Sequence, residues 1–364
     1  MAGNFVQLHN HTHYSLLDGA SKVPDLVKRV KELGMPAVGI TDHGNMHGAY
    51  ELWRAAVDSG VKPIIGIEAY VTPETARQDK TRVSWDTNWT PVPGHARNPD
   101  DVSGGGLITH LTMWAENDEG LVNLIKASSV ANLEGRVMRY PRMDKEVLST
   151  YSKGVIASSG CPSGIIQTRL RLGQFDEALR AAGEFQDIFG KDNFYIELMD
   201  HGLSIESKVT GDLLTIAKKL GAPLLATNDS HYVMEADKDA QDAMLCINSG
   251  ATLDDPNRFK FEGSGYYIKS AEEMRELFKD HPDACDNTLE IAERCNVIFD
   301  DHEDGAFMPQ FDCPEGWDET SLFLKKVEEG LEKRYDGNPP MEVLKQADYE
   351  CGVICQMQFC GYFL

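Results

Sequence analysis

The chain has 364 residues, of which 41% are hydrophobic, and its 35 Lys and Arg residues against 58 Asp and Glu residues give a net charge of −23. This length exceeds the range of a single core, so we expect one large domain with a smaller appendage. No apolar run approaches the ~18 residues of a membrane span and no secretory signal is recognised, so we expect a soluble, cytoplasmic protein without membrane contact. The acidic surface argues against nucleic-acid binding through a general basic field. Eight scattered cysteines without a disulfide framework indicate reduced thiols.

Between residue 5 and about residue 231, short apolar runs alternate with amphipathic helical stretches. Seven strands are predicted at 5–8, 37–40, 63–67, 107–115, 155–158, 194–198 and 224–226. Helices are predicted from about 21 to 34, with Pro24 near the start and Gly34 at the end, and over 46–59, 117–131, 163–190 and 204–220. This alternation is typical of parallel strands joined by helical crossovers, either in a barrel or in a doubly wound sheet.

A long insert at 72–106 interrupts this rhythm, rich in Pro, Gly and Asp and ending in three consecutive glycines. It contains basic and aromatic residues together: Arg77, Lys80, Arg82, Arg97, Trp85 and Trp89. Such a mixture can clamp and stack on a single nucleic-acid strand. A surface excursion without a function is the alternative, and the sequence favours neither.

Beyond residue 235 the strand pattern stops and helices are predicted over 235–248, 271–280, 284–295 and 319–334, with a turn-rich stretch at 300–317. The apolar stretch 360–364 ends in mid-pattern, so we expect it to pack on something further along a longer polypeptide. The spacing of Cys351, Cys355 and Cys360 fits positions on helix faces better than a zinc site.

Two imidazoles, His9 and His11, follow the first predicted strand, with the carboxylate of Asp18 shortly afterwards. Side chains at i and i+2 point the same way on an extended segment, whereas on a helix they diverge. Two such imidazoles with a nearby carboxylate are typical ligands of Zn, Mn or Fe.

Residues of the same kind lie at or near the ends of most other predicted strands, and the full set is His9, His11, Asp18, His43, Glu68, His110, Cys161, Asp229 and His231. The carboxyl ends of parallel strands are where barrels and open α/β sheets build their active sites. This set exceeds what one ion takes, so we predict two or three divalent metals (Zn²⁺, Mn²⁺ or Fe²⁺) with Glu68 as a bridging ligand. Clustered dications activate water and neutralise phosphate oxygens, which predicts phosphoester hydrolysis.

These residues stand in motifs that resemble the PHP (polymerase and histidinol phosphatase) domain: His9-Asn10-His11, Thr41-Asp42-His43-Gly44-Asn45, Gly66-Ile67-Glu68, His110, Gly160-Cys161-Pro162-Ser163-Gly164 and Asn228-Asp229-Ser230-His231. The stretches 8–19 and 255–269 are most similar to the PHP domain of bacterial C-family replicative polymerases, the DNA polymerase III alpha subunits, of actinobacterial type. The resemblance implies an α/β fold, a distorted (βα)₇ TIM-like barrel over 1–285, followed over 286–364 by a mainly helical connector to a polymerase palm domain.

The resemblance also implies roles for single residues. One ion would take His9, His11, Glu68 and Asp229, a second Glu68, His110 and Cys161, and a third Asp18, His43 and His231. The implied activity is a proofreading 3′→5′ exonuclease that acts on the 3′ end of DNA. Asp200 and His201 are further candidates for binding the substrate phosphate. The carboxylates for nucleotide addition would lie outside this sequence.

Two other functions are compatible with the same ligand set. One is a small-molecule phosphatase of the histidinol-phosphate type, and the other is a non-catalytic, metal-stabilised scaffold for polymerase partners. The resemblance implies as partners the rest of the polymerase and replisome subunits such as the sliding clamp or a separate proofreader. The sequence leaves open whether the chain is a fragment, a split gene product or a free-standing protein.

Overall fold

The computed structural model describes residues 5–91, 98–299 and 308–364. The chain forms two compact units, Met1–Phe299 and Asp300–Leu364. We expected the division at 285/286, but helix α11 (Pro282–Arg294) packs against strand β7 and so lies with the first unit. Among the described residues, no helix combines the length and the apolarity needed to span a membrane.

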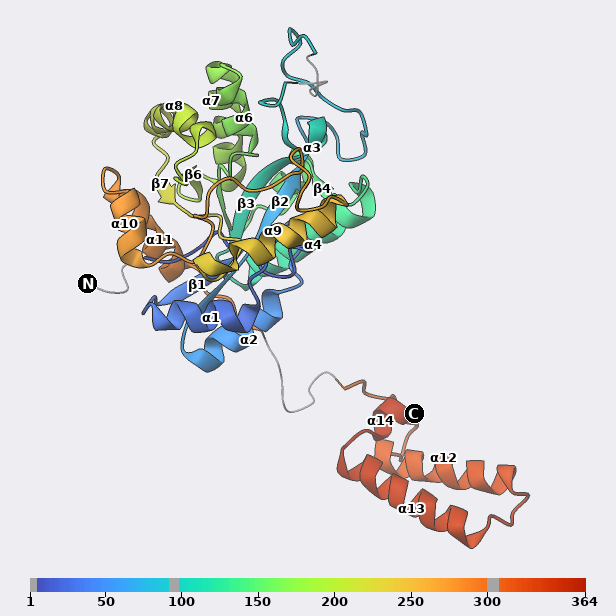
Figure 1. Cartoon of the computed structure of the whole chain (residues 1–364). Helices are drawn as coiled ribbons and strands as arrows, with labels where there is room; N and C mark the ends of the chain where they lie inside the picture. The colour runs from blue at the N-terminus through green and yellow to red at the C-terminus, as the bar shows by residue number, and fades with distance from the viewer. Residues whose placement is uncertain (1–4, 92–97, 300–307) are drawn as a thin grey trace. The chain divides into compact units, whose positions relative to one another are not determined.

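The first unit contains a seven-stranded sheet surrounded by helices, which confirms the predicted α/β class (Figure 1). Its strands are β1 (Ala37–Ile40), β2 (Lys62–Val71), β3 (Thr109–Ala115), β4 (Arg142–Met143), β5 (Val155–Ser158), β6 (Phe194–Leu198) and β7 (Leu224–Ala226). The strand order is β1-β2-β3-β5-β6-β7, and β4 lies beside β2. The short strand β4 was not predicted from the sequence.

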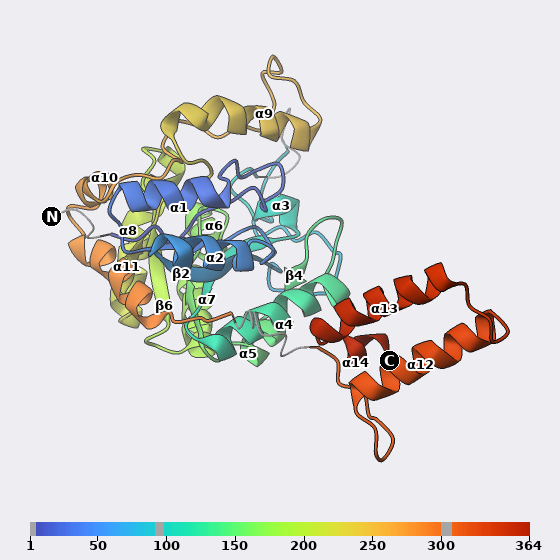
Figure 2. The ribbon, with the colours of Figure 1, turned by 90° about the horizontal axis from the view of Figure 1, so that it is seen from below.

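The helices of the first unit are α1 (Val23–Glu32), α2 (Ala49–Ser59), α3 (Ser103–Gly106), α4 (Asp118–Glu134), α5 (Lys145–Thr150), α6 (Ile165–Arg171), α7 (Phe175–Phe189), α8 (Ser204–Leu220), η1 (Glu235–Asp237), α9 (Lys238–Ser249), α10 (Ala271–Leu277) and α11. Helices α1 and α2 lie side by side and α2 packs on β2 (Figure 2). The single helix predicted over 163–190 is in fact two, because Gly173 turns the chain with a φ of 72°.

The predicted strand 5–8 is not a regular strand; the bridging segment 5–12 takes its place. Its backbone forms isolated parallel bridges, Gln7 with Val38 on one side and Asn10 with Ser230 on the other. The Asn10 side chain donates to the carbonyl oxygens of Gln7 and Gly39 at 2.9 and 2.8 Å, so a side chain replaces part of the backbone ladder. The segment therefore connects the two end strands of the sheet, because it pairs with β1 on one side and with the residues just after β7 on the other.

Strand β3 runs antiparallel to both of its neighbours, β2 and β5, whereas we predicted parallel strands throughout. The other strand pairs of the sheet are parallel. The amino end of β3 therefore lies at the same edge as the carboxyl ends of the parallel strands. His110, the second residue of β3, reaches that edge for this reason.

A cluster of buried apolar side chains lies at the edge of the sheet opposite to His110. It includes Trp114, whose indole Nε1 donates to the carbonyl oxygen of Leu8 at 3.0 Å. Each strand of the sheet except β4 contributes to it, and Ile291 and Ala292 of α11 complete it. One edge of the sheet is thus closed by hydrophobic packing, which leaves the other edge for polar side chains.

The insert 72–106 projects beyond the ends of the strands in Figure 1, and side-chain contacts tie its described part to the rest of the first unit. The Arg77 guanidinium pairs with Glu134, Asp144 and Glu146. The Arg169 guanidinium lies 3.8 Å from the centre of the Trp85 ring. The cation of Arg77 and one face of Trp85 are therefore occupied, which weakens the single-strand clamp interpretation; Arg97 lies outside the described residues.

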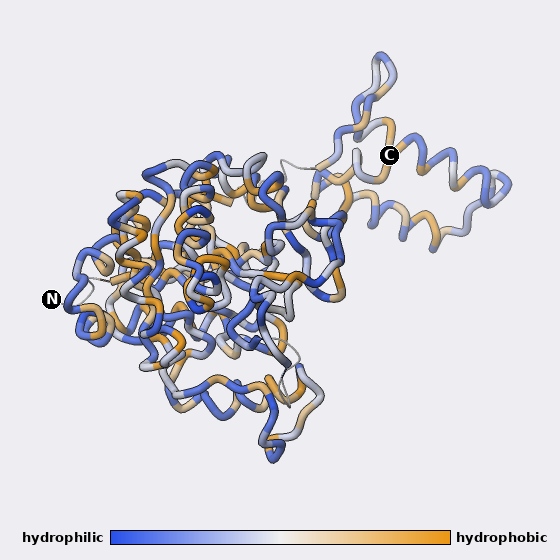
Figure 3. The backbone as a smooth tube through the Cα atoms, turned by 90° about the horizontal axis from the view of Figure 1, so that it is seen from above, coloured by the Kyte–Doolittle hydropathy of each residue, from blue (hydrophilic) through white to orange (hydrophobic). Residues whose placement is uncertain are grey.

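The second unit consists of α12 (Glu319–Arg334), α13 (Met341–Gln356) and α14 (Cys360–Phe363), so the helical character predicted for this part is confirmed. Figure 3 shows hydrophobic and hydrophilic residues alternating along its helices. Cys351 and Cys360 are buried together with Phe323 in its small core, as expected for positions on helix faces.

Candidate metal centre

All nine side chains that the sequence singled out as ligands converge at the carboxyl edge of the sheet. They come from the bridging segment and its following loop (His9, His11, Asp18), from the end of β1 (His43), from β2 (Glu68), from the start of β3 (His110), from the loop after β5 (Cys161) and from the loop after β7 (Asp229, His231). The register explains the closeness, because the backbone pairs His43 with Glu68 and His110 with Gly164 just beyond the regular strands.

Glu68 lies at the centre of this group and is 1% exposed. Its Oε1 is 3.2 Å from His110 Nδ1 and 3.4 Å from His9 Nε2. Its Oε2 is 2.7 Å from His43 Nδ1 and 3.6 Å from His11 Nε2. One carboxylate thus faces four imidazoles with both oxygens, the arrangement required of a bridging ligand.

Asp229 and Asp18 complete the oxygen donors. Asp229 Oδ1 is 3.0 Å from His11 Nε2 and 3.3 Å from His9 Nε2. Asp18 Oδ2 is 2.9 Å from His43 Nε2 and 3.7 Å from His231 Nε2. Asp229 also has a left-handed backbone with a φ of 44°, and strained residues of this kind cluster at functional sites.

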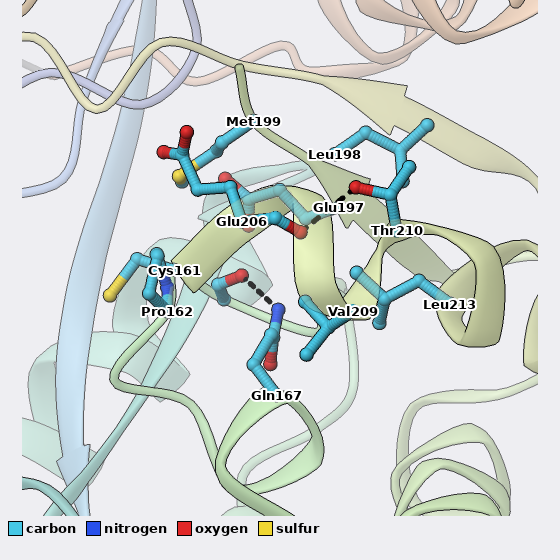
Figure 4. A pocket seen from close by; sticks show the side chains of 11 residues that line it. Cys161, Pro162, Gln167, Glu197, Leu198, Met199, Glu206, Val209, Thr210 and Leu213 are labelled. Carbon is cyan, nitrogen blue, oxygen red and sulfur yellow. Dashed lines mark hydrogen bonds between the residues drawn. The ribbon is translucent and has the colours of Figure 1, made fainter. Parts of the chain in front are cut away.

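Cys161 supplies the sulfur of the set, with its Sγ 3.4 Å from His110 Nδ1. Gln167 fixes the loop behind it by donating from Nε2 to the Gly160 carbonyl oxygen at 2.6 Å, a bond that is dashed in Figure 4. The pocket drawn there has a volume of only about 20 Å³, room for about one water molecule.

Many donor atoms of this group are buried without a hydrogen-bond partner: His9 Nε2, His11 Nε2, Asp18 Oδ1, His43 Nδ1, Glu68 Oε1, Glu68 Oε2, Asp229 Oδ1 and His231 Nε2. Nitrogen and oxygen atoms lie close together, yet they do not aim at one another as donor and acceptor. Because buried polar groups are normally satisfied, this pattern needs an explanation. Lone pairs that converge on shared points fit divalent cations, and the mixed N, O and S donors suit Zn, Mn or Fe.

Three subsets are close enough to hold an ion each, because within each subset the donor atoms lie within 4.8 Å of one another. These subsets are His9, His11 and Asp229; His43, Glu68 and His110; and His11, His43 and His231. They share members, so the geometry favours a cluster over separate sites.

A buried carboxylate behind the ligands, Glu197 of β6, was missed by the sequence reasoning. His9 Nδ1 lies 2.7 Å from Glu197 Oε1, and the same carboxylate accepts from the hydroxyls of Ser158 and Thr227. Since a carboxylate only accepts, Nδ1 of His9 is the donor and its Nε2 presents a lone pair to the centre. The only sign of Glu197 in the sequence is that it is the single charged residue inside the apolar run 194–198.

Asp42 supports His11 in the same way, through Ser15. The Ser15 hydroxyl donates to Asp42 Oδ1 at 2.6 Å, so its oxygen is free to accept from His11 Nδ1 at 3.0 Å. Asp42 also accepts from the backbone amide of Thr12 at 2.7 Å. Nε2 of His11 therefore faces the centre as a lone pair as well.

The direction of the pKa shift differs from one imidazole of the group to the next. Burial, together with neighbouring His43 and His231, lowers the pKa of His11 to about 3, which keeps its ring neutral and able to bind a metal. Burial acts to raise the pKa of Glu68, but the histidines around it, His110 first, hold that pKa well below its usual range. Burial and nearby carboxylates raise the pKa of the Cys161 thiol, a shift that a bound dication would reverse.

The other two residues that we proposed for substrate binding lie beside the ligand group. His201 is held on both ring nitrogens, with Nδ1 2.6 Å from Glu206 Oε1 and Nε2 2.9 Å from the Asn228 carbonyl oxygen. Its ring stacks on Tyr266 with centroids 4.0 Å apart. Asp200 is exposed and accepts from the Gly202 amide in a turn. The structure therefore places neither among the converging donors.

A cavity of about 500 Å³ opens onto this group. Its wall includes the candidate ligands Asp18, His43, His110, Cys161, Asp229 and His231, and His201 also lines it. A volume of this order is typical of small-molecule sites. The ligand group thus lies beside a space in which a substrate can reach it.

Comparison with known proteins agrees with this geometry. The model of the PHP domain family matches residues 7–201, more than half of the chain, and the chain therefore belongs to this family. It is 50% identical over 362 residues to DNA polymerase III subunit alpha of Mycobacterium leprae (strain TN), which covers 99% of this chain and 30% of that protein. It is 49% identical over 362 residues to the subunit of Mycobacterium tuberculosis (strain ATCC 25618 / H37Rv), with the same coverage. The relative from Borreliella burgdorferi (strain ATCC 35210 / DSM 4680 / CIP 102532 / B31) is 40% identical over 364 residues, 99% of this chain and 29% of its own. The chain thus spans about 30% of the length of these relatives.

Proposed function

We propose that this chain is a metal-dependent phosphoesterase that removes nucleotides from the 3′ end of DNA, as the PHP part of a replicative polymerase of the DNA polymerase III alpha type. One observation carries the proposal: buried donor atoms without hydrogen-bond partners converge on a single region from the bridging segment and its following loop, from β2 and from the loops after β1 and β7. The similarity to alpha subunits supplies the context of DNA replication.

Two or three divalent metals, Zn²⁺, Mn²⁺ or Fe²⁺, are proposed to occupy this region. His9, His11, Glu68 and Asp229 would hold one ion, and Glu68, His110 and Cys161 a second. Asp18, His43 and His231 would hold a third. The distances from Glu68 to four imidazoles support its role as the shared ligand.

Cations held there would supply Lewis-acid activation of water and neutralise charge on phosphate oxygens. The protein's own contribution is orientation. Glu197 and Ser15 fix which nitrogen of His9 and His11 faces the centre, so the ligands need no rearrangement when they bind. The cavity beside the ligands admits the substrate, while the apolar cluster at the opposite edge of the sheet keeps water out from behind.

We further propose that residues 286–364 act as a connector to the rest of a polymerase, and that replisome subunits are its partners in the cytoplasm. All eight cysteines are free, which suits a reducing compartment. Exposed apolar residues of the second unit, among them Tyr349, Tyr362 and Phe363, support a further packing surface there.

The proposal is tested by incubating the 364-residue chain with 5′-labelled single-stranded DNA and mismatched primers in the presence of Mn²⁺ or Zn²⁺. We expect stepwise shortening from the 3′ end that a chelator stops. Asp229→Asn should abolish it without unfolding, because asparagine tolerates the left-handed backbone at this position. Asp187→Asn, an exposed change on α7, is the matched control and should cut like the wild type.

The alternatives give different results in the same experiment. Hydrolysis of histidinol phosphate without any of DNA would favour the small-molecule phosphatase. Metal-dependent thermal stabilisation without hydrolysis of either substrate would favour the scaffold. Each of these results would contradict the proposed exonuclease.

A further inference from the structure

A second cavity, of about 330 Å³, also reaches the ligand group. Asp18 and His43 lie in its wall, and both residues line the larger cavity of about 500 Å³ as well. A strand that extended from one cavity to the other would pass these two proposed metal ligands. A small phosphate monoester needs only one of these cavities, whereas a polymer can use both.

The smaller cavity is lined by two arginines, Arg136 and Arg139. Arg136 Nε donates to the Met138 carbonyl oxygen at 3.4 Å, and Arg139 donates to the side-chain oxygen of Asn248. Among the described residues, neither guanidinium pairs with a carboxylate. Arg77, by contrast, pairs with three carboxylates in this chain of net charge −23. Two cations without an acidic partner at the mouth of an anion-processing site indicate phosphate binding.

The turn beside these arginines is held by hydrogen bonds of its own backbone. Val137 and Tyr140 exchange two backbone hydrogen bonds of 3.0 Å across it. Behind it, the fully buried Arg142 donates from Nε to the Gly135 carbonyl oxygen at 3.1 Å. Little conformational entropy is therefore lost in the backbone when a ligand binds to these arginines.

The larger cavity has a different character, because one loop lines it with aromatic rings. Phe261 meets the ring of His231 edge to face at 4.6 Å, and Phe259 packs against Phe261 at 5.8 Å. Phe259 is nevertheless 63% exposed. An exposed ring beside a metal ligand suits stacking with a nucleobase, since every base presents a π-face.

We propose that a single DNA strand lies across the ligand group, with the phosphates upstream of the scissile bond on Arg136 and Arg139 and the terminal nucleoside against Phe259 and Phe261. The placement of the scissile phosphate at the ligands rests on the proposed function. The binding surface itself rests only on the two cavities and their linings. The arginines then explain how a strongly acidic protein attracts a polyanion to this one place.

The test measures binding, without hydrolysis, by the fluorescence anisotropy of a labelled 12-nucleotide single strand and the chelator-treated 364-residue chain. The double variant Arg136→Gln/Arg139→Gln should bind about 10-fold more weakly at low salt. The slope of log K against log salt should fall by about 1.4, since each phosphate contact to a single strand contributes about 0.7. Arg54→Gln, which removes an arginine paired with Asp58 on α2, is the matched control and should bind like the wild type.

Three further arms separate the parts of the proposal. Phe259→Ser should weaken binding of the strand about 5-fold or more while leaving the salt slope unchanged, because stacking releases no counterions. Binding of thymidine monophosphate should not respond to the arginine variant. Arg136→Lys/Arg139→Lys, which keeps both charges, should restore most of the salt slope, and its melting temperature checks that the turn is intact.

Several results would overturn the proposal. One is a salt slope equal to that of the wild type in the glutamine variant. Another is an equal loss of affinity for the DNA strand in Arg54→Gln. A third is an equal loss of affinity for thymidine monophosphate in the glutamine variant. The outcome is separable from the proposed function. Arginine-dependent binding without any cleavage would contradict the exonuclease alone, and cleavage with binding indifferent to both arginines would contradict this surface alone.

Discussion

Replacing Glu197 by glutamine tests whether a carboxylate that touches no metal nevertheless sets the metal affinity of this centre. Glu197 accepts from His9 Nδ1 at 2.7 Å and from Thr227 Oγ1 at 2.5 Å, and it also accepts from Ser158. Glutamine has nearly the same shape but places an amide NH₂ where one oxygen accepts. The remaining amide oxygen is a neutral and weaker acceptor, so the proton of His9 is held less firmly on Nδ1 and its Nε2 is held less firmly as a lone pair.

The expected loss in metal affinity is about 10- to 100-fold, the usual effect of removing such an orienting partner. In free energy this is about 1.4–2.8 kcal/mol. The measurement is a competition titration of Zn²⁺ or Mn²⁺ between the protein and a chromophoric chelator. Circular dichroism of the metal-free variant checks that the fold persists.

Glu206→Gln provides a matched control. It breaks the same kind of pair, because Glu206 Oε1 lies 2.6 Å from His201 Nδ1, but His201 is outside the proposed ligand set. We expect this variant to bind metal like the wild type. If Glu197→Gln also binds like the wild type, or if both variants lose affinity equally, the reasoning about His9 is refuted.

Three further predictions concern stability. Metal at 100 times its dissociation constant should raise the unfolding free energy by about 2.7 kcal/mol for each site, as measured by urea denaturation, and Asp229→Asn should lose most of that gain. Burial lowers the pKa of Lys269 to about 8, so the folded state holds this proton less tightly than the unfolded chain does. The protonated side chain therefore lowers the unfolding free energy. This loss is complete below pH 8 and disappears near the unfolded pKa of 10.5. Relative to Lys269→Met, the wild type should therefore gain up to about 3 kcal/mol in unfolding free energy across that range, at about 1.4 kcal/mol per pH unit; a flat difference would contradict this. Asp318 caps α12 by accepting from the Ser321 amide at 2.7 Å, so Asp318→Ala should destabilise the second unit by about 1 kcal/mol in thermal unfolding, and no change would show that the cap is dispensable.

The sequence predicts the fold well where local pattern decides it. Strands β1, β5, β6 and β7 have the predicted bounds, because short apolar runs in a doubly covered sheet carry a clear signal. Strand direction carries no such signal. Strand β3 follows the long insert and pairs antiparallel to β2, and the apolar run 107–115 gives no sign of this direction.

The convergence of the proposed ligand residues could be predicted because their chemical types stand together at the ends of predicted strands. His110 illustrates the limit of this reasoning, since it reaches the ligand group from the start of an antiparallel strand and not from the end of a parallel one. Glu197 and Ser15 escaped notice because their roles depend on which nitrogen of a distant histidine they face. Only three-dimensional placement reveals such contacts.

The insert 72–106 shows why composition alone misleads. Its basic and aromatic residues resemble a nucleic-acid clamp, but Arg77 and Trp85 face partners on α4, α5 and α6 and in the loop before α5. Arg136 and Arg139, which line a cavity at the ligand group, stand in an unremarkable stretch of sequence. Whether a cation is available depends on which carboxylates the fold brings near it.

The most direct test of the account is anomalous diffraction from crystals of this chain grown with Mn²⁺ or Zn²⁺, recorded at the absorption edge of the metal. We predict two or three peaks among the nine ligands, with nitrogen and oxygen donors at about 2.0–2.2 Å from a zinc ion. One peak should lie within bonding distance of Glu68. Crystals without a peak in this region, or with these side chains turned away from one another, would contradict the metal centre and the proposed hydrolysis with it.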